Sequence, residues 1–205
     1  MADASGWDAP EPERTKGPSR YVQPKNWLEV KEGKKTSQVF RFRALNSPVV
    51  GTVVWGADGK PYRFKSEGDI PKDFKPRLQD KGKHKGKPEL PKTFWAFACW
   101  DYEQAIVKVY EMTQESLREG IRKIVKQWGA PLAYDMVATR EMVDGFWTYS
   151  IVNQPPKPLD AEGEKAWADL QAAGFDIGRL LEDGDPFPSA DAAPAAVAVQ
   201  EEAPF

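Results

Sequence analysis

The chain has 205 residues but only one cysteine, Cys99, and one histidine, His84. A lone cysteine cannot form a disulfide within the chain, and two such residues cannot supply the four ligands of a structural zinc site. We therefore expect neither a metal nor a cofactor. Cys99 lies in an apolar stretch and is expected to be a core thiol, whereas His84 lies between lysines and is expected in a solvated loop.

Long apolar runs are also missing, since even the stretch TFWAFACWDY is interrupted by Asp101. No segment approaches the roughly 18 apolar residues that a membrane-spanning helix needs. The first residues, MADASGWDAPEPER, lack the basic start and the apolar run of a signal peptide. These absences predict a cytoplasmic protein, located in the host cytoplasm if the protein is viral.

The motifs of common enzymes are absent as well. The sequence has no Walker motif and no glycine-rich dinucleotide fingerprint. Four core carboxylates could in principle gather around magnesium, but nothing forces them together, because adjacent strand positions face opposite ways. These carboxylates are Asp101, Glu103, Glu111 and Asp135. The sequence thus predicts a protein that is not an enzyme, and a metal-dependent nuclease is the weaker alternative.

The overall charge of -2 conceals a strong asymmetry along the chain. Residues 20–93 hold eighteen Lys and Arg against eight Asp and Glu, a net charge of +10. Residues 153–205 hold three against eleven, a net charge of -8. A strongly basic segment suits a polyanion such as nucleic acid, whereas an acidic segment suits a basic surface on a partner.

Hydrophobic periodicity predicts five main strands, from period two, and one helix, from period 3.6. In the first strand, Phe40, Phe42 and Ala44 are expected to face the core, and Arg41 and Arg43 are expected to form a basic outer face. The strands are expected at residues 36–45, 93–100, 105–112, 134–140 and 145–152, and the helix at residues 113–128.

The segment between the first two main strands is expected to be a long basic insertion. Residues 49–65 predict a hairpin, because Asp58-Gly59 supplies turn chemistry between two β-branched and aromatic runs. Residues 66–92 have no period and combine glycine, proline and closely spaced lysines, which predicts a loop. The lysines could simply be solvated, but their place beside a ligand groove favours contact with phosphates.

Five strands with a helix between the third and fourth follow the order of the OB-fold, a five-stranded Greek-key barrel. The fold class is therefore predicted to be mainly β with one core helix. Thr113 is expected to cap that helix, and Gly129 is expected to end it. The predicted organisation is a flexible tail at 1–19, an OB-fold domain at 20–152 with its insertion at about 46–92, a linker with short acidic helices at 153–182, and a disordered acidic tail at 183–205.

Cations and aromatic rings alternate through the basic part of the chain. Cations neutralise phosphates, and flat rings stack on bases whatever their sequence, so this pairing suits single-stranded nucleic acid. Phe40, Phe42, Phe97 and Tyr149 are expected in the core. The candidate binding residues are Arg41, Arg43, Trp55, Lys60, Tyr62, Arg63, Lys65, Trp95, Trp100, Lys108 and Tyr110.

The segments FWAF, VKVYEMTQ, YDMVATR and WTYSIV resemble the recurrent core of phage single-stranded DNA-binding proteins related to the helix-destabilising protein of T-even phages. The resemblance covers residues 93–152 well and residues 36–152 loosely. It implies an OB-fold that binds and protects single-stranded DNA, whatever its sequence, during replication, recombination and repair. The structural zinc of the T-even type lacks its ligands here, since only His84 and Cys99 are present.

The ending EEAPF is similar to the acidic, phenylalanine-terminated tails of bacterial and phage single-strand binders. That likeness implies that the tail docks phage or host replication and recombination proteins. The tail residues concerned are Glu201, Glu202, Pro204 and Phe205. An RNA-binding module, a protein adaptor and self-association all remain open, because the same residue pattern serves each of them.

Overall fold

The computed structural model describes residues 19–32, 35–80, 82 and 84–188. The predicted N-terminal tail at 1–19 therefore lies outside the described residues, except for residue 19. The predicted tail residues Glu201, Glu202, Pro204 and Phe205 lie outside them as well. Within the described ranges, no helix is both long and apolar enough to cross a membrane.

Eight strands and two α-helices make up most of the described chain. The strands are β1 (Leu28–Glu32), β2 (Lys35–Ala44), β3 (Val49–Trp55), β4 (Pro61–Phe64), β5 (Lys92–Asp101), β6 (Ile106–Met112), β7 (Tyr134–Val143) and β8 (Phe146–Pro156). The helices are α1 (Glu115–Trp128) and α2 (Ala161–Ala172), with short 3-10 turns η1 (Pro24–Asn26), η2 (Glu67–Asp69) and η3 (Ile177–Glu182). The prediction of a mainly β protein is confirmed.

All the strand pairs are antiparallel and form one open sheet in the order β4-β3-β5-β2-β7-β8, with β1 added to β2 and β6 added to β5. The described residues do not form the predicted closed five-stranded barrel. Closure would require β8 to reach the outer edge of β6, but the chain around Tyr21 already lies there. The amide of Val22 donates to the carbonyl of Val109 at 2.9 Å, and the amide of Val109 donates to the carbonyl of Arg20 at 2.9 Å.

Strand β5 separates two hydrophobic cores, because its alternate side chains face opposite ways. Phe97 and Cys99 join the first core with Phe40 and Phe42, as expected. Phe94 and Ala96 join a second core on the other face, which the sequence did not predict. Being buried on both faces explains why β5 is apolar along nearly its whole length.

The second core is covered by the C-terminal part of the described chain. Ile177 and Leu180 of η3, together with Phe187, pack against residues of β3, β5 and β6. The short acidic helices predicted within 153–182 are present as α2 and η3, but the prediction of a linker from 153 and of a disordered tail from 183 is wrong in two respects. Strand β8 continues through Pro156, and the chain stays packed against the sheet as far as Phe187, which is buried.

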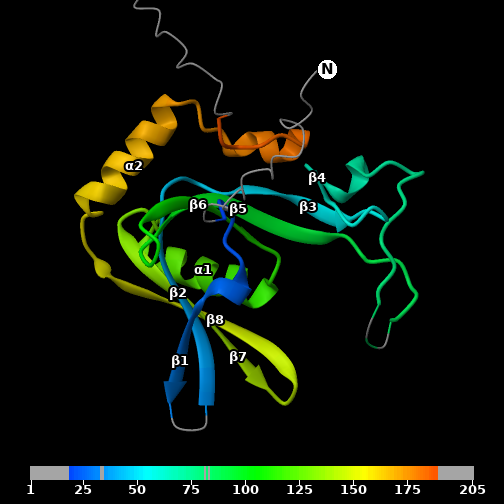
Figure 1. Cartoon of the computed structure of the whole chain (residues 1–205), viewed down its shortest axis with the longest axis horizontal. Helices are drawn as coiled ribbons and strands as arrows, with labels where there is room; N and C mark the ends of the chain where they lie inside the picture. Colours follow the sequence, from blue (N-terminus) through cyan, green and yellow to red (C-terminus); the bar gives the residue numbers. More distant parts are fainter. Residues whose placement is uncertain (1–18, 33–34, 81, 83, 189–205) are drawn as a thin grey trace, which may run out of the picture.

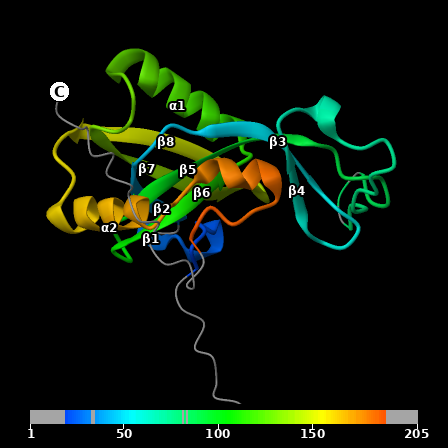
Figure 2. The same ribbon diagram turned by 90° about the horizontal axis from the view of Figure 1, so that it is seen from above.

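Part of the insertion predicted at about 46–92 becomes an arm, defined here as residues 56–80, 82 and 84–91. It extends sideways from the end of β3, well away from β7 and β8 (Figures 1 and 2). Bridges between Gly56 and Pro76 and between Leu78 and Pro88 hold it together. The ring of Phe74 also packs edge-on against Tyr62 and against Phe64. The predicted loop thus carries local structure.

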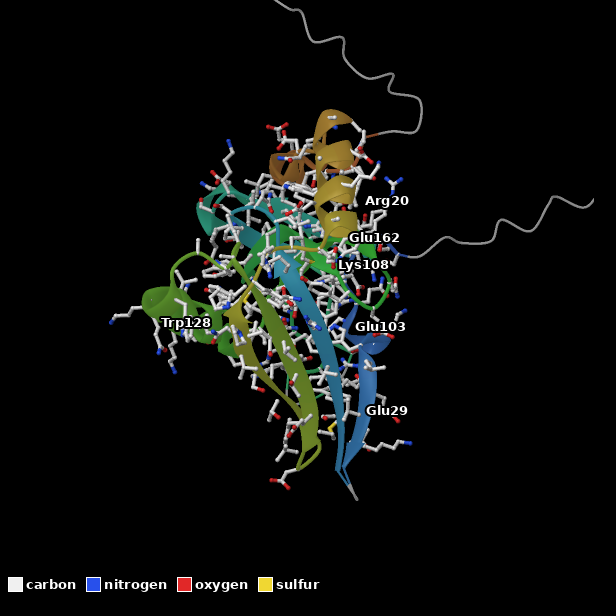
Figure 3. The ribbon with its side chains drawn as sticks, turned by 90° about the vertical axis from the view of Figure 1, so that its left-hand side faces the viewer. Arg20, Glu29, Glu103, Lys108, Trp128 and Glu162 are labelled. Carbon is white, nitrogen blue, oxygen red and sulfur yellow. The ribbon has the colours of Figure 1, made fainter. Side chains whose placement is uncertain are left out.

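Helix α1 packs against β8 at one point that requires a glycine. A Cβ on Gly120 would lie 2.5 Å from Cγ2 of Ile151, closer than atoms can approach. The N-cap is Gln114, so the predicted cap at Thr113 is wrong, whereas Gly129 ends the helix with a φ of 79°, as predicted. Figure 3 shows α1, which carries Trp128, and β1, which carries Glu29, on opposite sides of the strands between them.

Candidate nucleic-acid interface

Three of the predicted binding residues are buried in the sheet. Trp100 and Tyr110 are 1% and 2% exposed, and Lys108 is 4% exposed with its ammonium 2.7 Å from the carboxylate of Asp101. The expectation that these side chains reach the surface is therefore corrected. Strand alternation places residues on one of two faces, but both faces of β5 and β6 are covered here.

Arg43 is also buried, and this overturns the predicted basic outer face for that position. Its guanidinium donates to the carboxylate of Asp135 on β7, with Nε 2.9 Å from Oδ1, and to the main-chain oxygens of Leu132 and Lys157. Those two neighbouring segments cover the part of β2 that Arg43 occupies. Arg41, two residues earlier on the same face, remains half exposed.

Asp135 is the centre of a charged group that we call the Asp135 cluster, made of Asp135, Arg41, Arg43, Tyr102 and Lys157. Asp135 is fully buried. Arg41 Nη2 lies 2.6 Å from Oδ2, Lys157 Nζ lies 3.2 Å from Oδ2, and the Tyr102 hydroxyl donates to Oδ1 at 2.7 Å. Three cations therefore surround one carboxylate, which leaves the cluster with an excess of positive charge.

The neighbours of Asp135 determine its protonation. Burial alone would raise the pKa of Asp135, but hydrogen bonds from Tyr102, Arg41, Lys157 and Arg43 outweigh that effect and hold the pKa below its ordinary value. Burial and the hydrogen bond to Asp135 raise the pKa of Tyr102 above its ordinary value. At neutral pH, Asp135 is charged and Tyr102 remains a protonated donor.

The exposed side of the Asp135 cluster presents one aromatic ring between two cations. The guanidinium of Arg41 lies 4.5 Å from the centre of the Tyr102 ring, and the ammonium of Lys157 lies 5.0 Å from it. The side chains of Arg41 and Lys157 are 48% and 43% exposed, so both can reach a ligand without leaving the cluster. Phosphates and an aromatic base could both be held here.

The arm and the adjoining end of β3 carry five of the other predicted residues. Lys60 and Lys65 are exposed and make no ion pair within the described ranges. Arg63 pairs with Glu111 at 2.7 Å, and Tyr62 donates to Asp58 at 2.8 Å, so both are engaged within the protein. Trp55 is half-buried beneath the guanidinium of Arg77, which lies 4.8 Å from the ring.

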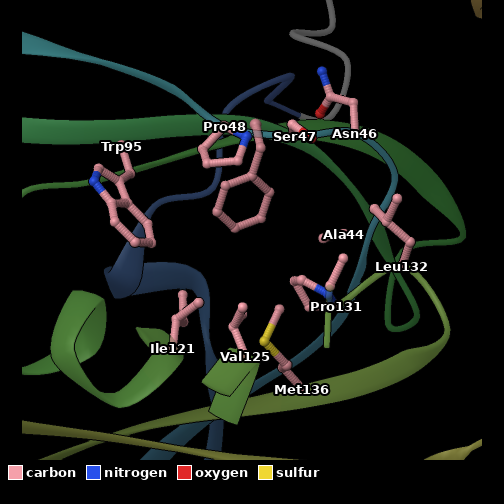
Figure 4. Close-up of a pocket in the computed structure, with 12 residues that line it drawn as sticks. Ala44, Asn46, Ser47, Pro48, Trp95, Ile121, Val125, Pro131, Leu132 and Met136 are labelled. Carbon is pink, nitrogen blue, oxygen red and sulfur yellow. The ribbon is translucent and has the colours of Figure 1, made fainter. Parts of the chain in front are cut away.

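Trp95 lies on β5 beside α1, where it lines an apolar pocket of about 220 Å³ (Figure 4). The guanidinium of Arg122 lies 5.0 Å from the centre of its ring. We call this cavity the α1 pocket. The predicted binding residues that are not buried therefore lie in three places, which are the Asp135 cluster, the arm with the adjoining end of β3, and the α1 pocket. The structure does not gather them at one point.

Sequence reasoning missed two members of the Asp135 cluster. Tyr102 lies between the strands expected at 93–100 and 105–112, and Lys157 lies within residues 153–182, where a linker with short acidic helices is predicted. The available signal was an aromatic residue, Tyr102, that lies between the acidic residues Asp101 and Glu103 in the sequence. The approach of Tyr102 and Lys157 to Arg41 depends on how the strands pair, and periodicity does not give the register of that pairing.

The two residues considered as metal ligands lie in different environments, one buried and one exposed. Cys99 is fully buried, as predicted, and burial raises the pKa of its thiol well above the ordinary value. His84 is exposed on the arm, also as predicted. Among the residues that the structure describes, no group of three or more His, Cys, Asp or Glu is arranged to hold a metal ion.

Comparisons of the chain with protein-family models, with curated protein sequences and with solved structures find no match.

Proposed function

We propose that the protein binds single-stranded DNA without sequence preference. The observation that carries this proposal is the exposed side of the Asp135 cluster, where Arg41 and Lys157 flank the ring of Tyr102. The two cations can neutralise adjacent phosphates, and the flat guanidinium of Arg41, which lies over the Tyr102 ring and is half exposed, offers a surface on which any base can stack. A duplex hides its base faces, so this combination favours a single strand.

The buried carboxylate makes this surface more suitable for binding rather than less. Asp135 fixes the positions of Arg41 and Lys157, so less side-chain entropy is lost when a phosphate binds. One negative charge against three positive charges leaves the cluster attractive to an anion. Exposed Lys60 and Lys65 on the arm supply further cations for phosphates.

The order of the core elements supports an opened form of the OB arrangement. Strands β2, β5 and β6 precede α1, and β7 and β8 follow it, so the helix stands between the third and fourth core strands. Strand β2 pairs with both β5 and β7 and joins the two halves of the sheet. OB-type sheets commonly bind oligonucleotides, which agrees with the proposed function.

The direct test is the double substitution Arg41→Gln with Lys157→Gln, which leaves Arg43 and Tyr102 in contact with Asp135. Two lost phosphate contacts should lower the affinity for a single strand by about 25-fold at about 0.1 M salt, since each contributes an exponent of about 0.7 to the salt dependence. Fluorescence anisotropy of a labelled thymidine homopolymer, titrated at several salt concentrations, measures both the affinity and the slope.

The matched control is Lys165→Gln, which removes an exposed lysine on the acidic helix α2. It should change neither quantity. If the double variant is folded and binds as tightly as the unaltered protein with the same salt slope, the Asp135 cluster is not the binding surface. If the unaltered protein binds no single strand, the proposed function itself is wrong.

Removing residues 189–205 should strengthen binding to a single strand. This segment holds three acidic residues, Asp191, Glu201 and Glu202, and no basic one, so it can compete with phosphates at a high effective concentration. The truncation has to end after Pro188, because Phe187 is buried. The same titration at low and high salt measures the effect, which salt should reduce. Weaker binding by a folded truncation would place part of the binding site within residues 189–205.

A further inference from the structure

The turn between β7 and β8 exposes an unusual amount of apolar surface. We define the hairpin tip as Met142, Val143, Phe146 and Trp147, with the turn residues Asp144 and Gly145 between them. All four apolar side chains are exposed, and Phe146 is the most exposed at 75%. The register pairs Val143 with Phe146 and Met142 with Trp147, so both faces of the tip are apolar. A cluster of this kind on a protein surface usually marks an interaction site.

The α1 pocket offers a complementary feature elsewhere on the molecule. Its walls include Trp95, Ile121, Val125, Leu132 and Met136, and Figure 4 shows these side chains around an empty space. A volume of about 220 Å³ accommodates one aromatic side chain. The few polar groups at its rim include Asn46, whose side-chain oxygen already accepts the amide of Ala98 at 2.7 Å. The pocket therefore suits an apolar group rather than a polar one.

The hairpin tip of one molecule cannot reach its own α1 pocket. Met136 lines the pocket on β7, and Val143 at the end of the same strand belongs to the tip. Seven residues along the strand separate the two, which corresponds to about 23 Å at a rise of about 3.3 Å per residue. An occupant with the chemistry of the tip must come from a second molecule.

The charges around the two features are also complementary. At the pocket, Arg122 lies over Trp95 and pairs with Glu119, and Lys123 and Lys126 on the same half of α1 add positive charge with no acidic residue between them. The turn of the hairpin tip carries Asp144, which is exposed. Docking the tip at the pocket brings an acidic turn toward a basic helix end, which favours this orientation.

We propose that the protein self-associates head to tail, with Phe146 of one copy inserted into the α1 pocket of the next. The two surfaces differ, so the contact is heterologous and leaves a free tip at one end and a free pocket at the other. Such an assembly extends by repeated addition of copies. It goes beyond DNA binding and does not depend on it, although an extendable assembly suits a protein that covers a long strand.

Sedimentation of the full chain over a range of concentrations tests the proposal. The unaltered protein should form reversible species larger than a dimer, and Phe146→Ala should remove them. Leu90→Ala is the matched control, because Leu90 is 70% exposed on the arm and belongs to neither surface. An unaltered protein that stays monomeric, or a Phe146→Ala protein that associates normally, would overturn the proposal.

A mixing experiment separates this contact from a symmetric one. Val125→Glu blocks the pocket at a position that is 37% exposed, and the variant keeps its tip. Each single variant should be monomeric, whereas Phe146→Ala mixed with Val125→Glu should form a one-to-one complex and nothing larger. Leu132→Glu, at a second exposed rim position, replaces Val125→Glu if that variant does not fold. A mixture that remains monomeric contradicts the head-to-tail contact.

Discussion

Asp135→Asn is expected to lower the free energy of unfolding by about 3–5 kcal/mol, because it leaves a buried cation without its counter-charge. Arg43 is 2% exposed, and Asp135 is its only acidic partner among the described residues. The asparagine keeps the size of the side chain and removes only the charge. Urea unfolding followed by circular dichroism measures the difference, and Asp73→Asn, an exposed aspartate on the arm, should change it little.

The same substitution should reduce the acid sensitivity of the protein. The pKa of Asp135 is held below its ordinary value in the folded state, so its contribution to stability is fully present above the unfolded pKa of about 3.9. That contribution is lost as the pH falls through the lower folded pKa. The gap between the unaltered protein and Asp135→Asn should therefore be largest near neutral pH and shrink in acid. A gap that does not change with pH would show that the charge of Asp135 is not responsible.

Phe187→Ala is expected to lower the free energy of unfolding by about 3–5 kcal/mol, the usual effect of truncating a buried phenylalanine. The Phe187 ring lies 5.3 Å from Phe175 and 6.4 Å from Tyr21, measured between centroids, and the guanidinium of Arg20 lies 5.0 Å from it. It therefore holds the C-terminal segment against the chain that occupies the edge of β6. Urea unfolding is again the measurement.

Leu78→Ala, which truncates a side chain that is 58% exposed on the arm, is the control for Phe187→Ala. It should change the stability by much less. If Phe187→Ala lowers the free energy of unfolding as little as Leu78→Ala does, the segment after η3 does not contribute to the folded core. The domain boundary predicted at residue 183 would then be restored.

Hydrophobic periodicity alone was sufficient to predict most of the strands and the helix of the core. The alternation of Phe40, Phe42 and Ala44 along β2 placed all three in the core, and each is buried. The period of 3.6 placed one helix at residues 113–128, and α1 spans Glu115–Trp128. These predictions succeed because the repeat of a strand or a helix is a local property of the backbone, which nearby residues determine.

The candidate site was much less predictable. Arg41 and Arg43 share one face of β2, yet the first is half exposed and the second is buried, because the segments at Leu132 and Lys157 cover only the second. Nothing local distinguishes the two arginines. Trp95 and Trp100 lie five residues apart on β5 and so face opposite sides of the sheet, where Trp95 lines the α1 pocket and Trp100 is buried.

By itself, the sequence determined the mainly β character, the single helix between the third and fourth core strands, and the concentration of positive charge before residue 94. The tertiary structure alone decided that the sheet stays open, that the chain through Phe187 completes a second core, and that Tyr102 and Lys157 join Arg41 at Asp135. The physical reason is that burial, edge pairing and ion pairing depend on contacts between residues far apart in the chain, and local periodicity carries no information about which distant segment arrives.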